Sequence, residues 1–371
     1  MRAAFCEAIL IASNRTAIAA VLCFWGRGME DIRQQVTSQI VAMMEQAGGV
    51  PPWHKSWSSG GLHCNASSGA FYKGINQLIL SISSAAGSAG STGSADVRWL
   101  TYKQAEYMGL QVRKGERGTR IVKMVEVNRR QAAQEAAAGG DVLAEDGAKA
   151  LIMRAYTVFN ASQIDGLAPM PARACNITCA DAVEQIVFGL QRTGLKVNYG
   201  QGFQPCYIPR TDEVRCPPAS EFHSLEDFHA TILHESAGHG SQAMKRLAMM
   251  SSDTPRFGSA EYARLELVAE LVSAQLGAEL GLPMGPSLIE SHASYLSSWL
   301  QVLKGDKNEI FRAAANAQKI CDYVGRLAVE AQPFVLPEAA VSELESDELV
   351  HQRAPFGVPK QEPKRSPKPV F

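Results

Sequence analysis

The sequence predicts an α+β fold with two domains: a small mixed α/β domain at the N-terminus and a mainly helical domain after it. The chain has 371 residues, enough for two hydrophobic cores at about 100–200 residues per domain. Residues 120–127 and 154–160 alternate apolar and polar side chains, which is typical of strands. From residue 181 onward the apolar residues recur at helical spacing instead.

The individual elements follow from this periodicity and from the turn-forming residues between them. A helix is expected over residues 30–47, where Val36, Ile40 and Met44 recur at helical spacing. Residues 206–209 and 213–216 flank a polar turn and predict a β-hairpin. The other expected helices cover residues 99–108, 181–192, 225–245, 260–280, 287–304 and 308–330.

Composition along the chain suggests where the domains begin and end. Residues 1–28 are interpreted as an extension outside the fold, because the first patterned helix starts just after Met29. Asn14 and Arg15 interrupt the apolar stretch in this extension, so no membrane span and no membrane role are expected. The predicted segments are a first domain at 29–170 with flexible parts at 83–95 and 128–150, a second domain at 175–330, and a disordered tail at 331–371.

Charge and cysteine content exclude several classes of protein. There are 36 Lys and Arg residues against 37 Asp and Glu residues, so the chain is neither a uniformly basic nucleic-acid coat nor an acidic solvating chain. The eight cysteines are scattered and complete no zinc-ribbon spacing. Reduced thiols and a cytoplasmic location are therefore expected.

Residues 98–123 form a local exception to the balanced charge. They contain seven basic and two acidic residues, and Trp99 and Tyr102 lie among them. Cations that follow phosphates, combined with aromatic faces on which bases stack, are typical of single-stranded DNA binding. Alternatively, the aromatic residues belong to the core and the basic residues form a solvated rim. Composition alone does not decide between these two readings.

The strongest chemical signal is the segment FHATILHESAGH at residues 228–239, which resembles the HExxH helix of zinc peptidases. The spacing departs from that motif, because His234 and His239 are five apart and would lie about 140° apart on an ideal α-helix. A π-bulge around residues 236–238 would restore both ligands. Alternatively, the metal site is remodelled or inactive, or the helix is unrelated to metal binding.

A second acidic segment supplies the remaining candidates for this site. Glu266 and Glu270 share one face of the expected helix at 260–280. A carboxylate from a later helix is the third ligand that a zincin requires, and a neighbouring carboxylate can orient a ligating imidazole. The alternative is a solvated pair of glutamates on a helix surface.

Several segments in order resemble the ArdC-type anti-restriction proteins, which are related to TraC-type primases. The resemblance covers about residues 29–330 apart from the 128–150 segment. The matching segments are PPWHKSW at 51–57, YKGIN at 72–76, WLTYKQA at 99–105, GLQVRKGERGTRI at 109–121, YTVFNASQIDG at 156–166, the hairpin at 207–218, the His-Glu helix, RFGS at 256–259, LVAEL at 267–271, and residues 292–303.

The resemblance implies an N-terminal domain that binds single-stranded DNA and a zincin-like metallopeptidase domain with zinc as its cofactor. In that family the intact protein shields incoming plasmid DNA from host restriction. By position, His234, His239 and Glu266 match the metal ligands, Glu235 the catalytic glutamate, and Glu270 a residue that supports a ligand. The expected DNA-binding residues are Trp53, Lys55, Trp57, Tyr72, Lys73, Asn76, Trp99, Lys103, Gln104, Arg113, Lys114 and Arg117.

Three functions compete at this point. The leading one is a single-stranded-DNA-binding anti-restriction protein of a plasmid or mobile element. The second is an active zinc metallopeptidase that cleaves a host protein, with the N-terminal domain as a targeting module. The third is a structural relic whose C-terminal domain only contacts other proteins. The inserted residue between His234 and His239 puts peptidase activity in question.

Overall fold

The computed structural model describes residues 32–46, 61–85, 96–137, 142–146, 149–170, 178–250, 255–282 and 286–331. Several expectations lie outside these ranges: the extension at 1–28, most of the flexible loop at 83–95, the PPWHKSW segment and the tail after residue 331. Within them, the architecture is a mixed α+β fold with an N-terminal sheet and a helical C-terminal region that contains a small sheet, as predicted.

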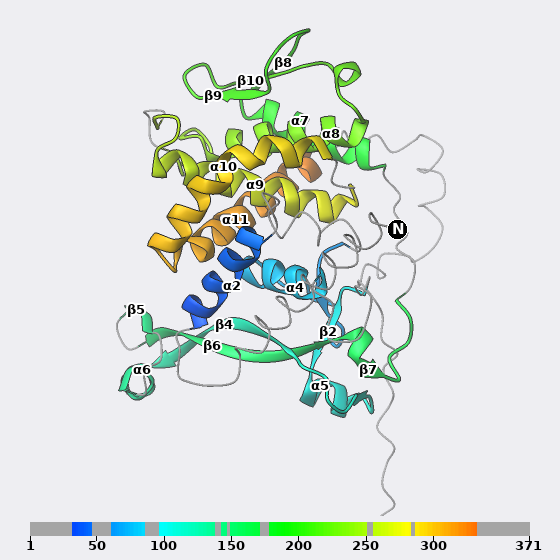
Figure 1. The fold of residues 1–371 in the computed structure, drawn as a ribbon, viewed down its shortest axis with the longest axis vertical. Coiled ribbons are helices and arrows are strands. Elements are labelled where there is room, and N and C mark those ends of the chain that lie inside the picture. Colours follow the sequence, from blue (N-terminus) through cyan, green and yellow to red (C-terminus); the bar gives the residue numbers. More distant parts are fainter. Residues whose placement is uncertain are drawn as a thin grey trace, which may run out of the picture. The chain divides into compact units, whose positions relative to one another are not determined.

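A long antiparallel strand pair forms the largest part of the N-terminal sheet (Figure 1). Strand β4 (Thr119–Asn128) pairs with β6 (Lys149–Asn160) from Thr119 opposite Val158 to Asn128 opposite Lys149. The sheet order is β1-β2-β6-β4, with β1 at Cys64–Asn65 and β2 at Arg98–Thr101. The two strands predicted at 120–127 and 154–160 are therefore confirmed, and both are longer than predicted.

The segment at 128–150, predicted to be a flexible insertion or linker, contains regular secondary structure in the residues that the structure describes there. Asn128 precedes helix α6 (Arg129–Ala137), and its side-chain oxygen accepts a hydrogen bond from the Gln131 backbone amide at 2.9 Å. Strand β5 (Val142–Asp146) then pairs with β6. Ala132 of α6 packs in a small cluster with Val127, Ala150 and Ile152. Burial of Ala132 among these neighbours anchors the short alanine-rich helix.

The helix predicted over 99–108 is divided into two elements. Residues 98–101 form β2, with Trp99 and Leu100 fully buried, and α5 covers only Tyr102–Tyr107. Thr101 separates them, because its hydroxyl accepts from the Gln104 amide while the Gln104 side chain accepts from the Thr101 amide. After α5, β3 (Gln111–Val112) pairs with β7 (Ile164–Asp165), and the short helix η2 (Ala161–Gln163) precedes β7.

Two helices of the N-terminal part pack against the rest of the fold. Helix α2 (Ile32–Gln46) buries Val36, Ile40 and Met44, so the predicted helical face is confirmed. Helix α4 (Ile75–Ala85) packs on β4 and on the last helix, α11 (Glu309–Ala331). Both helices share one hydrophobic core with the C-terminal helices. The division into two domains at about residue 170 stays a prediction.

The C-terminal region consists of helices with a three-stranded sheet at one end, drawn at the top of Figure 1. The predicted hairpin is confirmed as β9 (Cys206–Ile208) antiparallel to β10 (Glu213–Cys216), and β8 (Lys196–Tyr199), which was not predicted, lies parallel to β10. The short helix η3 (Ala219–Glu221) follows the hairpin. The remaining helices are α7 (Cys179–Arg192), α8 (Leu225–Ile232), the π-helix η4 (Leu233–Gly240), α9 (Ala260–Leu280) and α10 (Pro286–Gly305).

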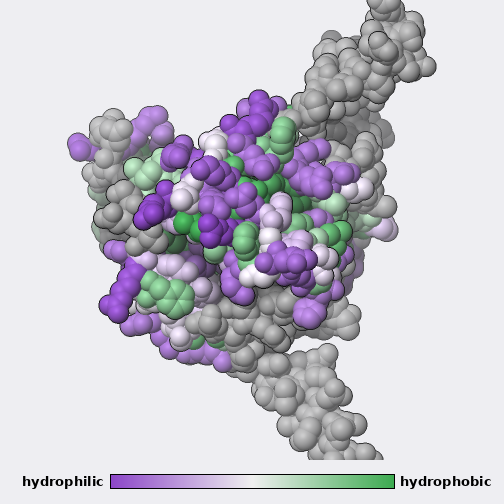
Figure 2. All heavy atoms as spheres, turned by 90° about the horizontal axis from the view of Figure 1, so that it is seen from above, coloured by the Kyte–Doolittle hydropathy of each residue, from purple (hydrophilic) through white to green (hydrophobic). Residues whose placement is uncertain are grey.

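The described residues also show the state of the cysteines and the character of the surface. The five cysteines in the described ranges are free thiols: Cys64, Cys179, Cys206, Cys216 and Cys321. Among the helices that the structure describes, none combines the length and apolarity needed to cross a membrane. The face drawn in Figure 2 carries small groups of hydrophobic residues among hydrophilic ones, an ordinary pattern for a protein surface.

A buried histidine in the N-terminal part predicts a pH-dependent stability. His63 is 3% exposed, and its Nδ1 accepts a hydrogen bond from the Trp99 indole at 3.0 Å. Burial lowers the pKa of His63 to about 4, and a hydrogen bond with the Val97 backbone opposes this only in part. His63 therefore stays neutral in the folded protein at pH values at which it is protonated in the unfolded chain, below about pH 6.5.

We expect the free energy of unfolding to fall by about 2 kcal/mol between pH 7 and pH 5 because of His63. The contribution is fully present above pH 6.5 and is lost as the pH falls toward 4. Urea unfolding of the wild type and of His63→Gln at both pH values measures it. An equal pH dependence in the two proteins would exclude His63 as the cause.

Candidate metal centre and nucleic-acid surface

The segment with the two candidate histidines starts as the regular α-helix α8 and continues without a break as the π-helix η4. Ser224 caps α8 by accepting a hydrogen bond from the Asp227 amide at 3.1 Å. From Leu233 to Gly240 the helix is a π-helix, in which hydrogen bonds join residues five apart. The Ser236 hydroxyl donates to the Ile232 carbonyl, a local bond that favours distortion of a helix. The irregular spacing of the histidines is therefore matched by a π-helix, the first of the three accounts that the sequence left open.

The π-helix brings the two histidines to the same side. The ring centroids of His234 and His239 lie 5.0 Å apart, and both side chains are almost fully buried. Glu266 of α9 faces them: its Oε2 lies 3.5 Å from His234 Nε2 and 3.3 Å from His239 Nε2. The ligand atoms of all three residues lie within 4.8 Å of one another.

These distances suit a tetrahedral metal. Bonds of about 2.0–2.1 Å to nitrogen and oxygen imply about 3.4 Å between neighbouring ligand atoms of a tetrahedral zinc site. The two nitrogen–oxygen distances, 3.5 and 3.3 Å, agree with this value. Two imidazoles and one carboxylate are also the donor set of several catalytic zinc sites, in which the fourth position stays open for water or substrate. The residues present therefore fit a metal ion.

Glu270 lies one helical turn after Glu266 and behind His234. Its Oε2 is 3.9 Å from His234 Nδ1, the ring nitrogen opposite the one that faces Glu266, and the residue is 1% exposed. A carboxylate in this position orients a ligating imidazole and raises its basicity. Support of His234 by Glu270 stays a prediction, because 3.9 Å is longer than a hydrogen bond.

Two tyrosines that the sequence did not single out lie beside Glu266. Burial and a hydrogen bond to Glu266 raise the pKa of Tyr262 well above its ordinary range. The Tyr262 hydroxyl lies 3.4 Å from that of Tyr295. Burial favours a neutral Glu266, but the two histidines outweigh it and hold the pKa of this carboxyl far below its usual value. Tyr262 precedes Glu266 by four residues, so helical spacing alone could have indicated it.

Glu235, the expected catalytic glutamate, is half-buried on the π-helix between the two histidines in sequence. It is outside the ligand triad. Burial first, and then the charges of Glu266 and Glu235, raise the pKa of Tyr295, although a hydrogen bond with Tyr262 opposes them. Glu235 therefore lies within electrostatic reach of this tyrosine.

The triad depends on a close approach between the π-helix and α9 at Gly238. A Cβ atom added to Gly238 would lie 2.8 Å from the Ala269 Cβ and 2.9 Å from its Cα. Ala269 is fully buried and lies between Glu266 and Glu270 in sequence. Any larger residue at 238 would therefore push α9, and with it both glutamates, away from the histidines.

A buried ion pair fixes the end of the π-helix to its neighbours. The guanidinium of Arg246 binds Asp212 with both terminal nitrogens, at 2.9 and 3.0 Å. The same guanidinium donates to the Gly240 carbonyl at 2.9 Å and to the Thr193 hydroxyl at 2.8 Å. Asp212 lies in the hairpin turn with φ of 52°. Arg246 thus connects the π-helix, the end of α7 and the hairpin.

The structure divides the twelve expected DNA-binding residues into several groups. Trp53, Lys55 and Trp57 lie outside the described residues. Four others support the fold through buried or half-buried side chains: Tyr72, Asn76, Trp99 and Gln104. Trp99 is completely buried, and the Asn76 amide bonds the backbone of Val122 in β4 at 2.7 and 2.9 Å. Trp99 therefore offers no face for stacking.

The remaining members of this set are exposed. Lys73 pairs with Asp322 of α11 at 3.2 Å, and Arg113 pairs with Glu116 and Asp165. Lys103, Lys114 and Arg117 also have exposed side chains. Neither Lys103 nor Lys114 forms an ion pair within the part of the chain that the structure describes. These two lysines are the best candidates for phosphate contacts.

Comparisons with known proteins match both halves of this architecture. Residues 30–159 match the N-terminal domain of anti-restriction factor ArdC, and residues 182–316 match a zincin-like metallopeptidase family. The metal-free crystal structure of the antirestriction protein ArdC from plasmid R388 is 34% identical, with a TM-score of 0.64, and the alignment covers 82% of this chain and all of that one. A Mn(II)-bound structure of the same protein is 33% identical.

The fold and site thus define a zincin-like metallopeptidase domain joined to an ArdC N-terminal domain. The chain belongs to the ArdC anti-restriction family. It is 38% identical over 307 residues to protein y4eC of Sinorhizobium fredii, which covers 81% of this chain and 94% of that protein. Two DNA primases TraC of Escherichia coli are 36% identical, but the chain spans only 27% and 19% of their lengths.

Proposed function

We propose that the protein binds single-stranded DNA and acts in anti-restriction for a plasmid or mobile element. The exposed lysines Lys103 and Lys114 carry this proposal, together with Arg113 and Arg117 nearby in sequence. Flexible cations of this kind neutralise phosphates without reading sequence. Membership of the ArdC family and the plasmid origin of the R388 structure support the biological role.

We expect the Lys103→Ala, Lys114→Ala double variant to bind single-stranded DNA more weakly and with a smaller salt dependence. Each lost phosphate contact lowers the slope of log K against log salt by about 0.7, so the double variant loses about 1.4. Fluorescence anisotropy at several salt concentrations measures this slope. Lys196→Ala with Lys319→Ala removes the same charge from exposed sites elsewhere and is the matched control. Equal slopes in both double variants would remove these lysines from the DNA surface.

The metal centre supports a second candidate, an active zinc metallopeptidase that cleaves a host protein. His234, His239 and Glu266 would hold the metal, with Glu270 orienting His234. Bound zinc polarises a carbonyl and lowers the pKa of a bound water. Glu235 would accept the proton of the attacking water, and the N-terminal domain would serve as a targeting module. The choice of zinc rests on the two imidazole donors and on the distances that suit a tetrahedral site.

Metal content separates the metal site from the peptidase activity. We expect near-stoichiometric zinc in the wild type and in Glu235→Gln, and almost none in Glu266→Ala, because only the last change removes a ligand. Glu270→Gln should weaken metal binding by about 10–100-fold. Elemental analysis after purification without chelator measures these values, and exposed Glu261→Gln on the same helix is the control. A wild type without metal would contradict the zinc assignment, and cleavage by Glu235→Gln would contradict the role of Glu235.

A further inference from the structure

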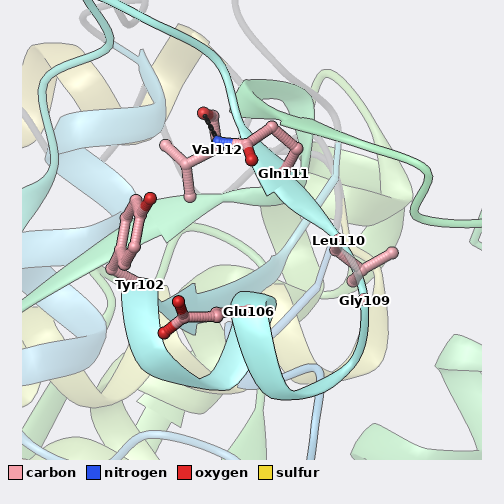
Figure 3. A pocket seen from close by; sticks show the side chains of 6 residues that line it. All are labelled: Tyr102, Glu106, Gly109, Leu110, Gln111 and Val112. Atoms are coloured by element: carbon pink, nitrogen blue, oxygen red, sulfur yellow. Dashed lines mark hydrogen bonds between the residues drawn. The ribbon is translucent and has the colours of Figure 1, made fainter.

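A small cavity lies between α5 and β3 in the N-terminal part (Figure 3). Its volume is about 260 Å³, and its lining residues are Tyr102, Glu106, Gly109, Leu110, Gln111 and Val112. This is slightly smaller than the roughly 300–1,000 Å³ of sites that enclose drug-sized molecules. The cavity suits a single small ring system.

The walls of this cavity are held in place by local structure. The Thr101–Gln104 capping box fixes the start of α5. Gly109, with φ of 72°, turns the chain back after the helix, and the Leu110 amide donates to the Ala105 carbonyl at 2.9 Å. Val112 is buried against a cluster that includes Leu100 and Ile164. The cavity is therefore preformed rather than assembled by a ligand.

Tyr102 and Glu106 supply the chemistry of the cavity. They are four residues apart on α5, so both side chains point to the same side of the helix (Figure 3). The Tyr102 side chain is a large hydrophobic surface with 51% of its area exposed. The Gln111 amide nitrogen is bonded to the Val112 carbonyl at 2.8 Å, which leaves its oxygen as an acceptor. A ligand in this cavity would contact the aromatic ring of Tyr102 and the acceptor oxygens of Glu106 and Gln111.

Basic residues lie near both ends of the segment 102–112, which lines the cavity. Lys103 directly follows Tyr102, and Arg113 and Lys114 directly follow Val112. Phosphates held by these cations would bring the bases of a strand next to Tyr102. An exposed aromatic ring then contributes about 1–3 kcal/mol for each base that stacks on it.

We propose that this cavity takes one unstacked base of a bound single strand and prefers a base with an exocyclic amino group. Tyr102 stacks on the base, and the Glu106 carboxylate accepts a hydrogen bond from its amino group. Thymine is disfavoured, because it presents carbonyl oxygens where cytosine presents the amino donor that carboxylates recognise. The inference rests on the proposed single-stranded DNA binding.

Homopolymers of dC and dT, matched in length and both pyrimidines, test the preference with the full chain. We expect the wild type to bind dC at least about five times more tightly than dT, which corresponds to about 1 kcal/mol for the amino contact. Glu106→Ala removes a charge and so changes both affinities, but the ratio of the two should fall to near one. A ratio unchanged by Glu106→Ala would overturn the proposed amino recognition.

Tyr102→Ala tests the stacking and has a matched control on the same helix. Tyr107 is 92% exposed and does not line the cavity. We expect Tyr102→Ala to weaken binding of both strands at least about fivefold, and Tyr107→Ala to change it less than twofold. Equal losses would overturn the assignment of Tyr102. If the wild type binds neither strand, the proposed function fails as well, whereas binding that responds to Lys103 and Lys114 but to neither cavity variant overturns the cavity alone.

Discussion

Replacement of Arg246 by methionine will lower the free energy of unfolding by about 3–5 kcal/mol. The side chain of Arg246 is 0% exposed and that of Asp212 is 5% exposed, so the variant removes the buried cation of this carboxylate and leaves only the exposed Lys245, 3.7 Å away. It also removes the donors to Gly240 and Thr193 that hold the end of the π-helix. Chemical denaturation at neutral pH measures the loss.

An exposed ion pair on the same hairpin is the control for this prediction. Arg215 pairs with Glu213 at 2.8 Å with a side chain that is 47% exposed, so Arg215→Ala should cost less than about 1 kcal/mol. Adding Asp212→Asn to the Arg246→Met variant should recover part of the stability, because asparagine tolerates the positive φ and carries no charge. If Arg246→Met costs no more than Arg215→Ala, the buried pair does not anchor the helix.

Gly238→Ala will both destabilise the fold and disrupt the metal centre. The added methyl group would lie 2.8–3.1 Å from the Cβ, Cα and carbonyl oxygen of Ala269, and two of these three atoms are backbone. Overpacking of this kind costs about 1–3 kcal/mol. Relief by separation of the two helices would move Glu266 away from His234 and His239. We therefore expect lower stability and much weaker metal binding in the same variant.

Gly240→Ala in the same π-helix is the control for Gly238→Ala. It separates the steric clash with Ala269 from the effect that alanine has on the stability of any helix. There the nearest atoms are the two terminal carbons of Leu195 at 3.4 Å, which is ordinary contact for a flexible side chain. Alanine at 240 should be neutral or stabilise by up to about 1 kcal/mol, because it favours helical backbone over glycine. Isothermal titration with zinc and thermal unfolding compare the two variants. Similar results for both would show that the approach of α9 at Gly238 is not limiting.

The sequence predicts elements well where their ends carry local signals. Helix α9 covers residues 260–280 as expected, because Ser259 accepts from the Tyr262 amide at its start and Gly281 adopts φ of 72° at its end. The division of residues 98–108 into a strand and a short helix was not predicted. There the deciding factor is the pairing of β2 with β6, and contacts between distant segments leave no periodic signal.

At the candidate site, too, contacts between distant segments could not be predicted from the sequence. The residue types and spacing were enough to select His234, His239, Glu266 and Glu270, but their convergence depends on the π-helix and on the approach of α9 at Gly238. In the N-terminal part, the sequence could not separate buried Trp99 from exposed Tyr102, since both are aromatic residues in the same basic segment. Only packing against β6 and α4 distinguishes them.

The shared core of α2, α4 and the C-terminal helices has a thermodynamic consequence. A ligand that binds only the folded state raises the free energy of unfolding by about 2.7 kcal/mol at a hundredfold excess over its dissociation constant. Since α2 and α4 share this core with α9 and α11, metal held by α9 would stabilise them too. Occupancy of the metal site would thus be linked to the packing of α4 on β4 in the N-terminal sheet.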